Sequence, residues 1–222
     1  MTTGMAPQIY KNAKNFVLEN FAADLQWQMS RDHTCFSESD LLREGAWVIL
    51  CCGFRESIVR HQFSYISLCF CDWDSALAIV DKCELCKETA AARFNNYRKL
   101  DAIVELAKCI VREGFGVFRS RIDRSPMQAL QKIPFIGPVT AFHLAKNLGF
   151  PVAKPDRHLE RLAITLGFAD THAMCQEISE LSGDPVPVVD LVLWRYAEQQ
   201  NGRRERSSRG THRGEIPHAI DS

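Results

Sequence analysis

The sequence predicts an all-α fold of about eight helices joined by short connections. Apolar residues recur at every third or fourth position through most of the chain, which is the spacing of a helix with one buried face. Serine, aspartate, proline and glycine residues stand where these stretches would begin or end. No stretch alternates apolar and polar residues for long, and no hairpin dipeptide separates two runs of β-forming residues.

Two long amphipathic helices are expected in the first half of the chain. The first contains Ile9, Ala13, Phe16, Val17 and Phe21. The second contains Leu100, Ile103, Val104, Ala107, Ile110 and Val111. Gly114 follows the second helix and is expected to end it, because glycine readily adopts the backbone conformations that close a helix.

Shorter helices are expected after residue 124. Ser125 and Pro126 are typical of an N-cap and a first helical turn, and they open a helix that we expect to run through Ile133. Pro138 opens the next helix and Gly149 closes it.

The last part of the chain is expected to contain two more helices and a tail. Asp156 opens a helix that ends at Gly167, and the segment of residues 184–187 introduces a last helix through Trp194. Residues 201–222 contain few apolar side chains, so we expect them to form a basic, disordered tail.

The composition is that of a globular chain. Its 222 residues, 46% hydrophobic and 24% charged, suffice for one large domain or two small lobes, and exclude collagen-like and disulfide-scaffold chains. No apolar run approaches the roughly 18 residues of a membrane span, and no export signal is visible. We therefore expect nine reduced cysteines and a cytoplasmic protein, associated with the nucleoid if the source is bacterial. We also expect the protein to be a monomer.

The charges are unevenly distributed although the net charge is zero. Residues 87–165 carry 14 basic and 7 acidic side chains, whereas residues 1–86 carry 7 basic and 11 acidic ones. A basic middle segment is typical of a face that binds a polyanion, but also of charges that merely cluster on a solvated surface. Charge alone does not decide between these two interpretations.

The segment from Leu130 to Ala141 carries the strongest functional pattern, Leu-Gln-Lys-Ile-Pro-Phe-Ile-Gly-Pro-Val-Thr-Ala. We expect one helix to end in it, a tight turn to follow, and a second helix to begin with free backbone N–H groups. Such a helix start is suited to an anion, because its N–H groups and its dipole point outward. A DNA phosphate is the expected anion, and the residues expected to contact DNA are Ile136, Gly137, Val139, Thr140 and Lys154.

This segment and the one from Gly149 to Arg161 resemble the helix-hairpin-helix, Gly/Pro-rich loop and aspartate (HhH-GPD) of one superfamily of DNA glycosylases. Endonuclease III, the adenine glycosylase and the alkylpurine glycosylases belong to it. Asp156 follows Gly137 at the separation that the superfamily uses, and weaker similarity spans residues 36–196. The resemblance implies one glycosylase domain, residues 1–200, made of two helical lobes with a DNA-binding cleft. Lobe one comprises residues 36–149, and lobe two comprises residues 1–35 and 150–200.

Three features depart from the superfamily pattern. Phe135 replaces the first glycine of the hairpin, and Val139 stands where bifunctional members carry the lysine that forms a Schiff base. The cysteine quartet of the iron–sulfur cluster is absent, since only Cys175 follows Cys109. The resemblance therefore implies a monofunctional enzyme without a cofactor. Such an enzyme flips a modified base out of double-stranded DNA and hydrolyses its N-glycosidic bond, leaving an abasic site.

Asp156 is the candidate catalytic residue. Breaking an N-glycosidic bond builds positive charge on the deoxyribose, and a nearby carboxylate can stabilise that charge and orient a water molecule. The commoner role of aspartate at a helix start is to cap the helix. With the hairpin and the spacing beside it we favour catalysis, which is compatible with capping.

The resemblance also suggests which residues contact the flipped base or fill the gap that it leaves. Phe54 and Arg55, at the turn after Gly53, correspond to a wedge that enters the duplex. Candidates for the base pocket are Trp47, Tyr97, Asp190 and Trp194. Each of these residues has the alternative of a purely structural role, with the aromatic ones packed in the core.

Four cysteines suggest a zinc site, namely Cys69, Cys71, Cys83 and Cys86. The first pair is too closely spaced for a zinc knuckle and lies in an apolar stretch, so we expect buried thiols and no metal.

The alternative function is a non-catalytic helix-hairpin-helix DNA-binding module, which needs the hairpin but no carboxylate in a cleft. The base that a glycosylase would remove is left open. The mixture of aromatic and polar pocket candidates favours a neutral modified base over a cationic alkylated purine. It is either an oxidised base, removed in base excision repair, or a hypermodified base of phage DNA, removed in antiviral defence.

Overall fold

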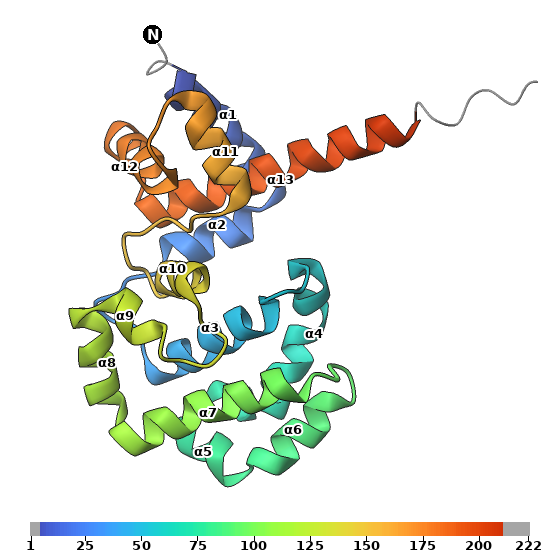
Figure 1. Ribbon diagram of the computed structural model, residues 1–222, viewed down its shortest axis with the longest axis vertical. Coiled ribbons are helices and arrows are strands. Elements are labelled where there is room, and N and C mark those ends of the chain that lie inside the picture. The colour runs from blue at the N-terminus through green and yellow to red at the C-terminus, as the bar shows by residue number, and fades with distance from the viewer. Residues whose placement is uncertain (1–4, 211–222) are drawn as a thin grey trace, which may run out of the picture.

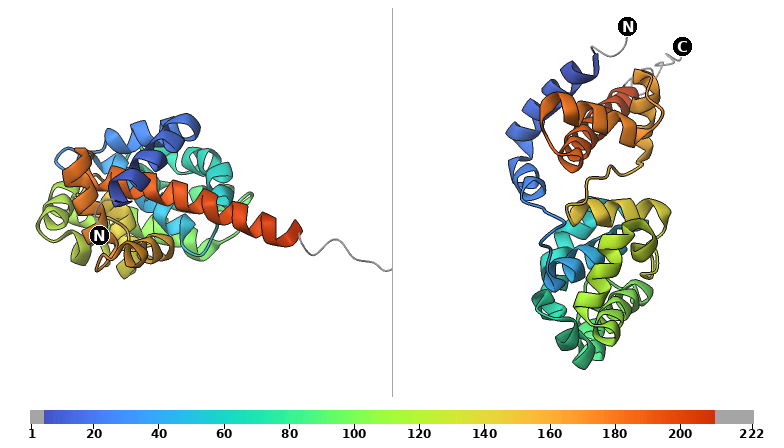
Figure 2. Two further views of the ribbon diagram at one scale, coloured as in Figure 1. Left: turned by 90° about the horizontal axis from the view of Figure 1, so that it is seen from above. Right: turned by 90° about the vertical axis from the view of Figure 1, so that its left-hand side faces the viewer.

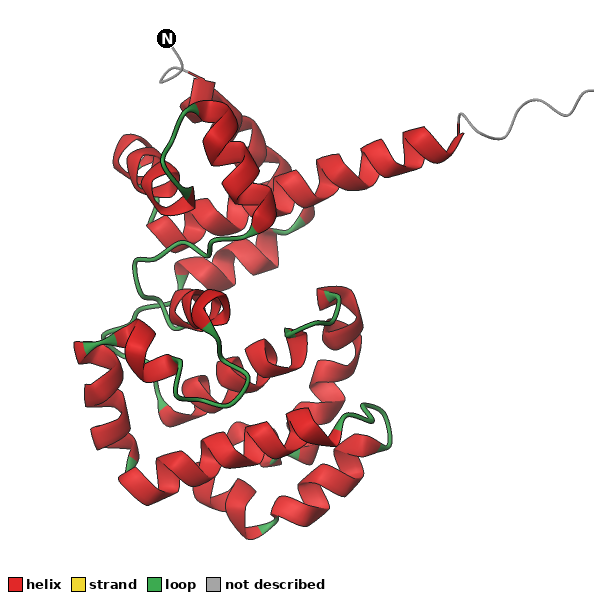
Figure 3. Cartoon of the chain, viewed as in Figure 1, coloured by secondary structure: helices red, strands yellow, loops and turns green. Residues whose placement is uncertain are grey.

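The structure is a computed structural model that describes residues 5–210. In this range the chain is helical, with short loops and no strand (Figure 3), so the all-α prediction is confirmed. Thirteen α-helices and one 3-10 helix follow one another in the described residues: α1 (Met5–Asn20), α2 (Ala22–Met29), α3 (Glu38–Cys51), α4 (Glu56–Cys69), η1 (Cys71–Trp73), α5 (Ala76–Asp81), α6 (Cys83–Ala91), α7 (Tyr97–Glu113), α8 (Phe115–Arg124), α9 (Pro126–Leu130), α10 (Pro138–Asn147), α11 (Arg157–Leu166), α12 (Thr171–Ser182) and α13 (Val186–Gly210).

The helices are more numerous than predicted, because short turns divide the region between α3 and α7 into several helices. Between α4 and α5 the backbone of Cys71, Asp72 and Trp73 is left-handed, with φ values of 56°, 48° and 64°. Ser75 then caps α5 by accepting a hydrogen bond from the N–H of Ala78 at 3.2 Å. The helix boundaries in this region depend on local backbone geometry, which the spacing of apolar residues does not indicate.

The boundaries marked by glycine and proline agree better with prediction. Gly114 and Gly167 end α7 and α11 with positive φ values of 78° and 84°. Pro138 opens α10 as predicted. The helix that begins at Pro126 was predicted to continue through Ile133 but ends at Leu130, because residues 131–137 form the turn into α10.

The buried apolar residues form two separate clusters. The larger cluster lies within residues 36–150 and is built from α3 to α10 with the start of the loop that follows. The smaller cluster combines residues 6–25 of α1 and α2 with residues 153–193 of the last three helices and the loop before them. Figure 1 shows the smaller cluster's helices above and the larger cluster's helices below, and the right view of Figure 2 shows one group stacked on the other.

The two chain segments that join the clusters touch at Gly149. Its φ is 90°, and a Cβ atom there would lie 2.7 Å from the backbone nitrogens of both Asp32 and His33. Only glycine allows this approach. The His33 ring also packs on Phe150, with ring centroids 4.9 Å apart. The loop that leads toward Asp156 is thereby held against the first connection.

The last helix is longer than predicted. α13 extends from Val186 to Gly210, past Trp194, and projects beyond the other helices (Figures 1 and 2). Residues 201–210, predicted as the start of a disordered tail, are therefore helical. A helix already nucleated by packing extends at little cost, since each added residue gains one backbone hydrogen bond and arginine favours the helix. The rest of the predicted tail, residues 211–222, lies outside the described residues. Among the residues that the structure describes, no helix has both the length and the apolar character of a membrane span.

Candidate functional site

A cavity of about 770 Å³ lies between the two clusters. Its walls come from α2, α3 and α4 on one side, from α10, and from the loop of residues 154–157 with α13. Most residues predicted for the site line this cavity: Trp47, Phe54, Val139, Thr140, Lys154, Asp156, Asp190 and Trp194.

Asp156 stands on the cavity wall at the start of α11. Its Oδ1 accepts the backbone N–H of His158 at 2.9 Å, and its extended backbone is that of an N-cap. Its own N–H donates to the carbonyl oxygen of Lys154 at 2.7 Å, which tightens the loop before the helix. The capping role and the position in the cavity therefore occur together.

α9 and α10 are joined by the turn of residues 131–137. Ile136 is buried in the larger cluster and anchors the turn, so it contacts the core instead of presenting a side chain to DNA. The N–H of Gly137 donates to Oγ1 of Thr140 at 2.7 Å, and the helix's first backbone bond runs from Ala141 to Gly137. The N–H groups of Val139 and Thr140 precede that bond and have no acceptor within the helix, which suits an anion.

Phe135 occupies this turn in a left-handed conformation, with a φ of 65°. Its ring centroid lies 5.5 Å from Nζ of Lys99, and the Phe54 ring lies 5.2 Å from the same nitrogen. Lys99 is buried, and its Nζ donates to the carbonyl oxygens of Leu50 at 3.0 Å and Cys52 at 2.6 Å at the end of α3. One cation therefore joins the end of α3 to both exposed aromatic rings. Lys99 was not predicted as a site residue, because the carbonyl oxygens that it hydrogen-bonds belong to residues 47 or more positions away in the chain.

Asp190, a pocket candidate, is buried with both carboxylate oxygens engaged. Oδ1 pairs with Nζ of Lys146 on α10, and Oδ2 accepts the backbone N–H of Lys154 at 2.7 Å. These contacts fasten α10 and the loop before Asp156 to α13. Burial, with the nearby charge of Lys146, lowers the pKa of Lys154.

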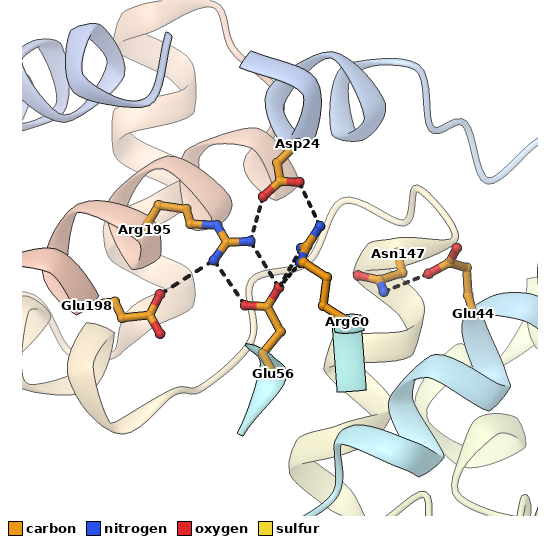
Figure 4. A network of polar contacts seen from close by, with 7 residues as sticks. All are labelled: Asp24, Glu44, Glu56, Arg60, Asn147, Arg195 and Glu198. Carbon is orange, nitrogen blue, oxygen red and sulfur yellow. Dashed lines mark hydrogen bonds and ion pairs between the residues drawn. The ribbon is translucent and has the colours of Figure 1, made fainter. Parts of the chain in front are cut away.

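Two further titratable side chains in the cavity were not predicted. Burial raises the pKa of Glu44 to about 7, and Nδ2 of Asn147 donates to its Oε2 at 2.9 Å (Figure 4). Burial and the positive charges of Lys154 and Lys146 lower the pKa of His143 well below its usual range. A signal was present in the sequence, since His143 and Asn147 follow Val139 at steps of four residues on one helix face.

The predicted aromatic and wedge residues divide into two groups. Trp47 and Trp194 line the cavity as partly buried side chains, and Phe54 lines it at 40% exposure. Arg55 and Tyr97 do not line the cavity. Both are exposed, at the starts of α4 and α7. The structure therefore does not bring Arg55 and Tyr97 into a base pocket.

An ionic network forms part of the cavity lining, and its contacts are drawn in Figure 4. Arg195 on α13 contacts Glu56 on α4 and also contacts Asp24 on α2 at 2.5 Å. Arg60 contacts the same two carboxylates, at 3.3 Å for Asp24 and through Nε at 2.9 Å for Glu56. Glu198 lies 3.5 Å from Arg195 at the outer edge. All but Glu198 line the cavity.

The described residues contain no group of three or more histidine, cysteine, aspartate or glutamate side chains arranged to hold a metal ion. All nine cysteines, including the four considered for zinc, are free thiols. Comparisons of the chain with protein-family models, with curated proteins and with solved structures yield no match.

Proposed function

We propose that this protein is a monofunctional DNA glycosylase that removes a modified base from double-stranded DNA. The observation that carries the proposal is the position of Asp156, a helix-capping carboxylate that borders a cavity large enough for a flipped-out nucleoside. The first turn of α10 borders the same cavity and offers backbone N–H groups to an anion.

In this proposal, α9 and α10 act as the helix-hairpin-helix that holds a DNA phosphate. The modified base enters the cavity between the two lobes, and the Asp156 carboxylate stabilises the positive charge that develops on the deoxyribose. A water molecule adds to C1′ while the bond from C1′ to the base nitrogen breaks. The base departs with the electron pair and takes up a proton, and the proton lost by the water passes through Asp156 to solvent. The product is an abasic site.

The substrate class is a neutral modified base. Both an oxidised base, removed in repair, and a hypermodified base of phage DNA, removed in defence, belong to this class. The volume of the cavity accommodates either, and its lining offers aromatic faces and polar groups together.

The test compares Asp156→Asn with Asp170→Asn. Asp170 caps α12 in the same way, accepting the N–H of Ala173 at 2.8 Å, but it lies outside the cavity lining. Asparagine caps a helix as well as aspartate does, so neither change removes the cap. We expect Asp156→Asn to slow base release by about 100-fold or more, with DNA affinity within about twofold, because binding rests on phosphate contacts.

The substrates are an oligonucleotide panel of lesions and genomic DNA from phages with hypermodified cytosine, and abasic sites are counted. Wild-type rates in the Asp156→Asn variant would disprove the mechanism. Tight DNA binding with no abasic site from any substrate would instead favour the non-catalytic binding module.

A further inference from the structure

We propose that His143 selects the extruded base, hydrogen-bonding a neutral base and disfavouring a cationic alkylated one. The inference rests on the glycosylase function proposed above and adds the residue that decides its specificity.

The position of His143 follows from the cavity-facing side of α10. Val139, His143 and Asn147 stand on this side at successive turns, so His143 lies about 6 Å farther along the helix than Val139. The helix start is the proposed phosphate contact, and Asp156 is the proposed sugar contact. A base attached to that sugar extends into the remaining cavity, whose α10 wall is formed by His143 and Asn147.

Two of the residues that line the cavity, His143 and Gln28, have polar side-chain atoms without a hydrogen-bond partner among the residues whose side chains are described. The His143 ring makes no hydrogen bond there. Gln28 on α2 is 2% exposed and donates through Nε2 to the carbonyl oxygen of Lys146 at 3.1 Å, but its Oε1 is buried and unpaired. Buried polar atoms are normally hydrogen-bonded, so the unpaired Oε1 of Gln28 is an exception beside this cavity. The His143 ring is half-buried and lines the cavity, so its nitrogens can pair with a ligand there. A neutral imidazole supplies one donor and one acceptor.

The charges around His143 decide whether a neutral or a cationic base is favoured. Lys146 on α10 and Lys154 on the following loop both disfavour the protonated ring. The Asp190 carboxylate, on α13, contacts the same two lysines. It pairs with the Lys146 ammonium and accepts a hydrogen bond from the Lys154 backbone N–H. Glu44, on α3, holds a proton more tightly than an ordinary glutamate does. Burial is the main cause of the lowered His143 pKa, and the positive charges of Lys154 and Lys146 add to it. Both effects also disfavour a cationic base placed against the ring.

The experiment measures single-turnover excision from duplexes containing either 8-oxoguanine, which is neutral, or 7-methylguanine, which is cationic. A third duplex contains 5-hydroxymethylcytosine. The proteins are the wild-type full chain, His143→Leu, which keeps the side-chain size without hydrogen bonds, and His143→Gln, which keeps a neutral donor and acceptor. His143→Glu adds a negative charge at the same place.

We expect the wild type to prefer at least one neutral base over 7-methylguanine. His143→Leu should slow excision of that neutral base by about 10-fold, the loss of roughly one hydrogen bond, whereas His143→Gln should stay within about threefold. His143→Glu should raise the rate on 7-methylguanine relative to the neutral base. Thermal unfolding of each variant, with the ring NMR titration of His143 in the wild type, separates these effects from misfolding. The ring should titrate well below the ordinary range of histidine, because burial and the charges of Lys154 and Lys146 lower its pKa.

The outcomes separate the two proposals. If the wild type excises a base and His143→Leu keeps the same order of rates, the selection by His143 is wrong while the glycosylase function stands. A protonated ring at neutral pH, or a wild type that prefers 7-methylguanine, also overturns it. If the wild type releases none of these bases and none from the wider panel, both proposals fall.

Discussion

Arg195 and Glu56, 139 residues apart in the chain, form a two-bond ion pair that joins the two helical clusters (Figure 4). Nη1 of Arg195 lies 3.0 Å from Oε2 of Glu56, and Nη2 lies 3.0 Å from Oε1. Arg195 belongs to α13, which packs in the smaller cluster, whereas Glu56 begins α4, which packs in the larger one. The pair therefore sets the relative position of the two cavity walls.

The ion pair should contribute strongly to stability. Arg195→Met leaves the carboxylates of Asp24 and Glu56 without their buried partner, and we expect a loss of about 3 kcal/mol in the free energy of unfolding. Arg60→Met is the matched control, because Arg60 contacts the same carboxylates from a side chain that is 53% exposed. It should cost less than about 1 kcal/mol. Urea unfolding measures both, and equal losses would contradict the special role of Arg195.

Glu44 should make stability depend on pH. Its pKa is about 7 in the folded protein against an ordinary value of 4.5, so between these values the folded state holds a proton that the unfolded state has lost. Its contribution is complete below pH 4.5 and disappears as the pH rises through 7, a change on the order of 3 kcal/mol. Glu44→Gln keeps an acceptor for Asn147 and removes the titration.

The measurement for Glu44 is urea unfolding of the wild type and Glu44→Gln between pH 5 and pH 8. The stability of the wild type relative to the variant should fall across this range. If the difference in stability between the wild type and Glu44→Gln does not change with pH, the Glu44 carboxyl group titrates as an exposed one does.

Phe135 should be a strained position. An L-residue at a φ of 65° costs about 1 kcal/mol relative to glycine. We therefore expect Phe135→Gly to be more stable than Phe135→Ala by about that amount, although both lose the ring that covers Lys99. Comparing the two variants with each other cancels the loss of the ring. Thermal unfolding checks this, and a more stable alanine variant would refute the strain.

Borohydride should trap no covalent complex between the wild-type protein and DNA. Val139 has no amine. Two lysines line the cavity, of which Lys146 is paired with Asp190, so Lys154 is the one remaining lysine to test as a nucleophile. Val139→Lys places an amine at the turn of α10 and should give a trapped complex on a substrate that the wild type cleaves. Trapping by the wild type that Lys154→Ala abolishes would identify Lys154 as a nucleophile, and the monofunctional assignment would be wrong.

The sequence by itself determined the helical class and the boundaries set by single residues. Gly114 and Gly167 end their helices, and Pro138 and Asp156 mark helix starts, because these preferences depend on the backbone of one or two residues. The candidate residues at these boundaries could be placed for the same reason. Asp156 caps α11, and Val139 and Thr140 stand in the first turn of α10.

Only the tertiary structure decided which side chains share the cavity and in what state. Asn147 reaches Glu44 across 103 residues of sequence, and Asp190 is occupied by Lys146 and the Lys154 backbone instead of facing a base. The pKa shifts of Glu44 and His143 arise chiefly from burial, which no local pattern reports. Helix starts and stops are local, whereas desolvation and ion pairing depend on residues that packing brings together from distant parts of the chain.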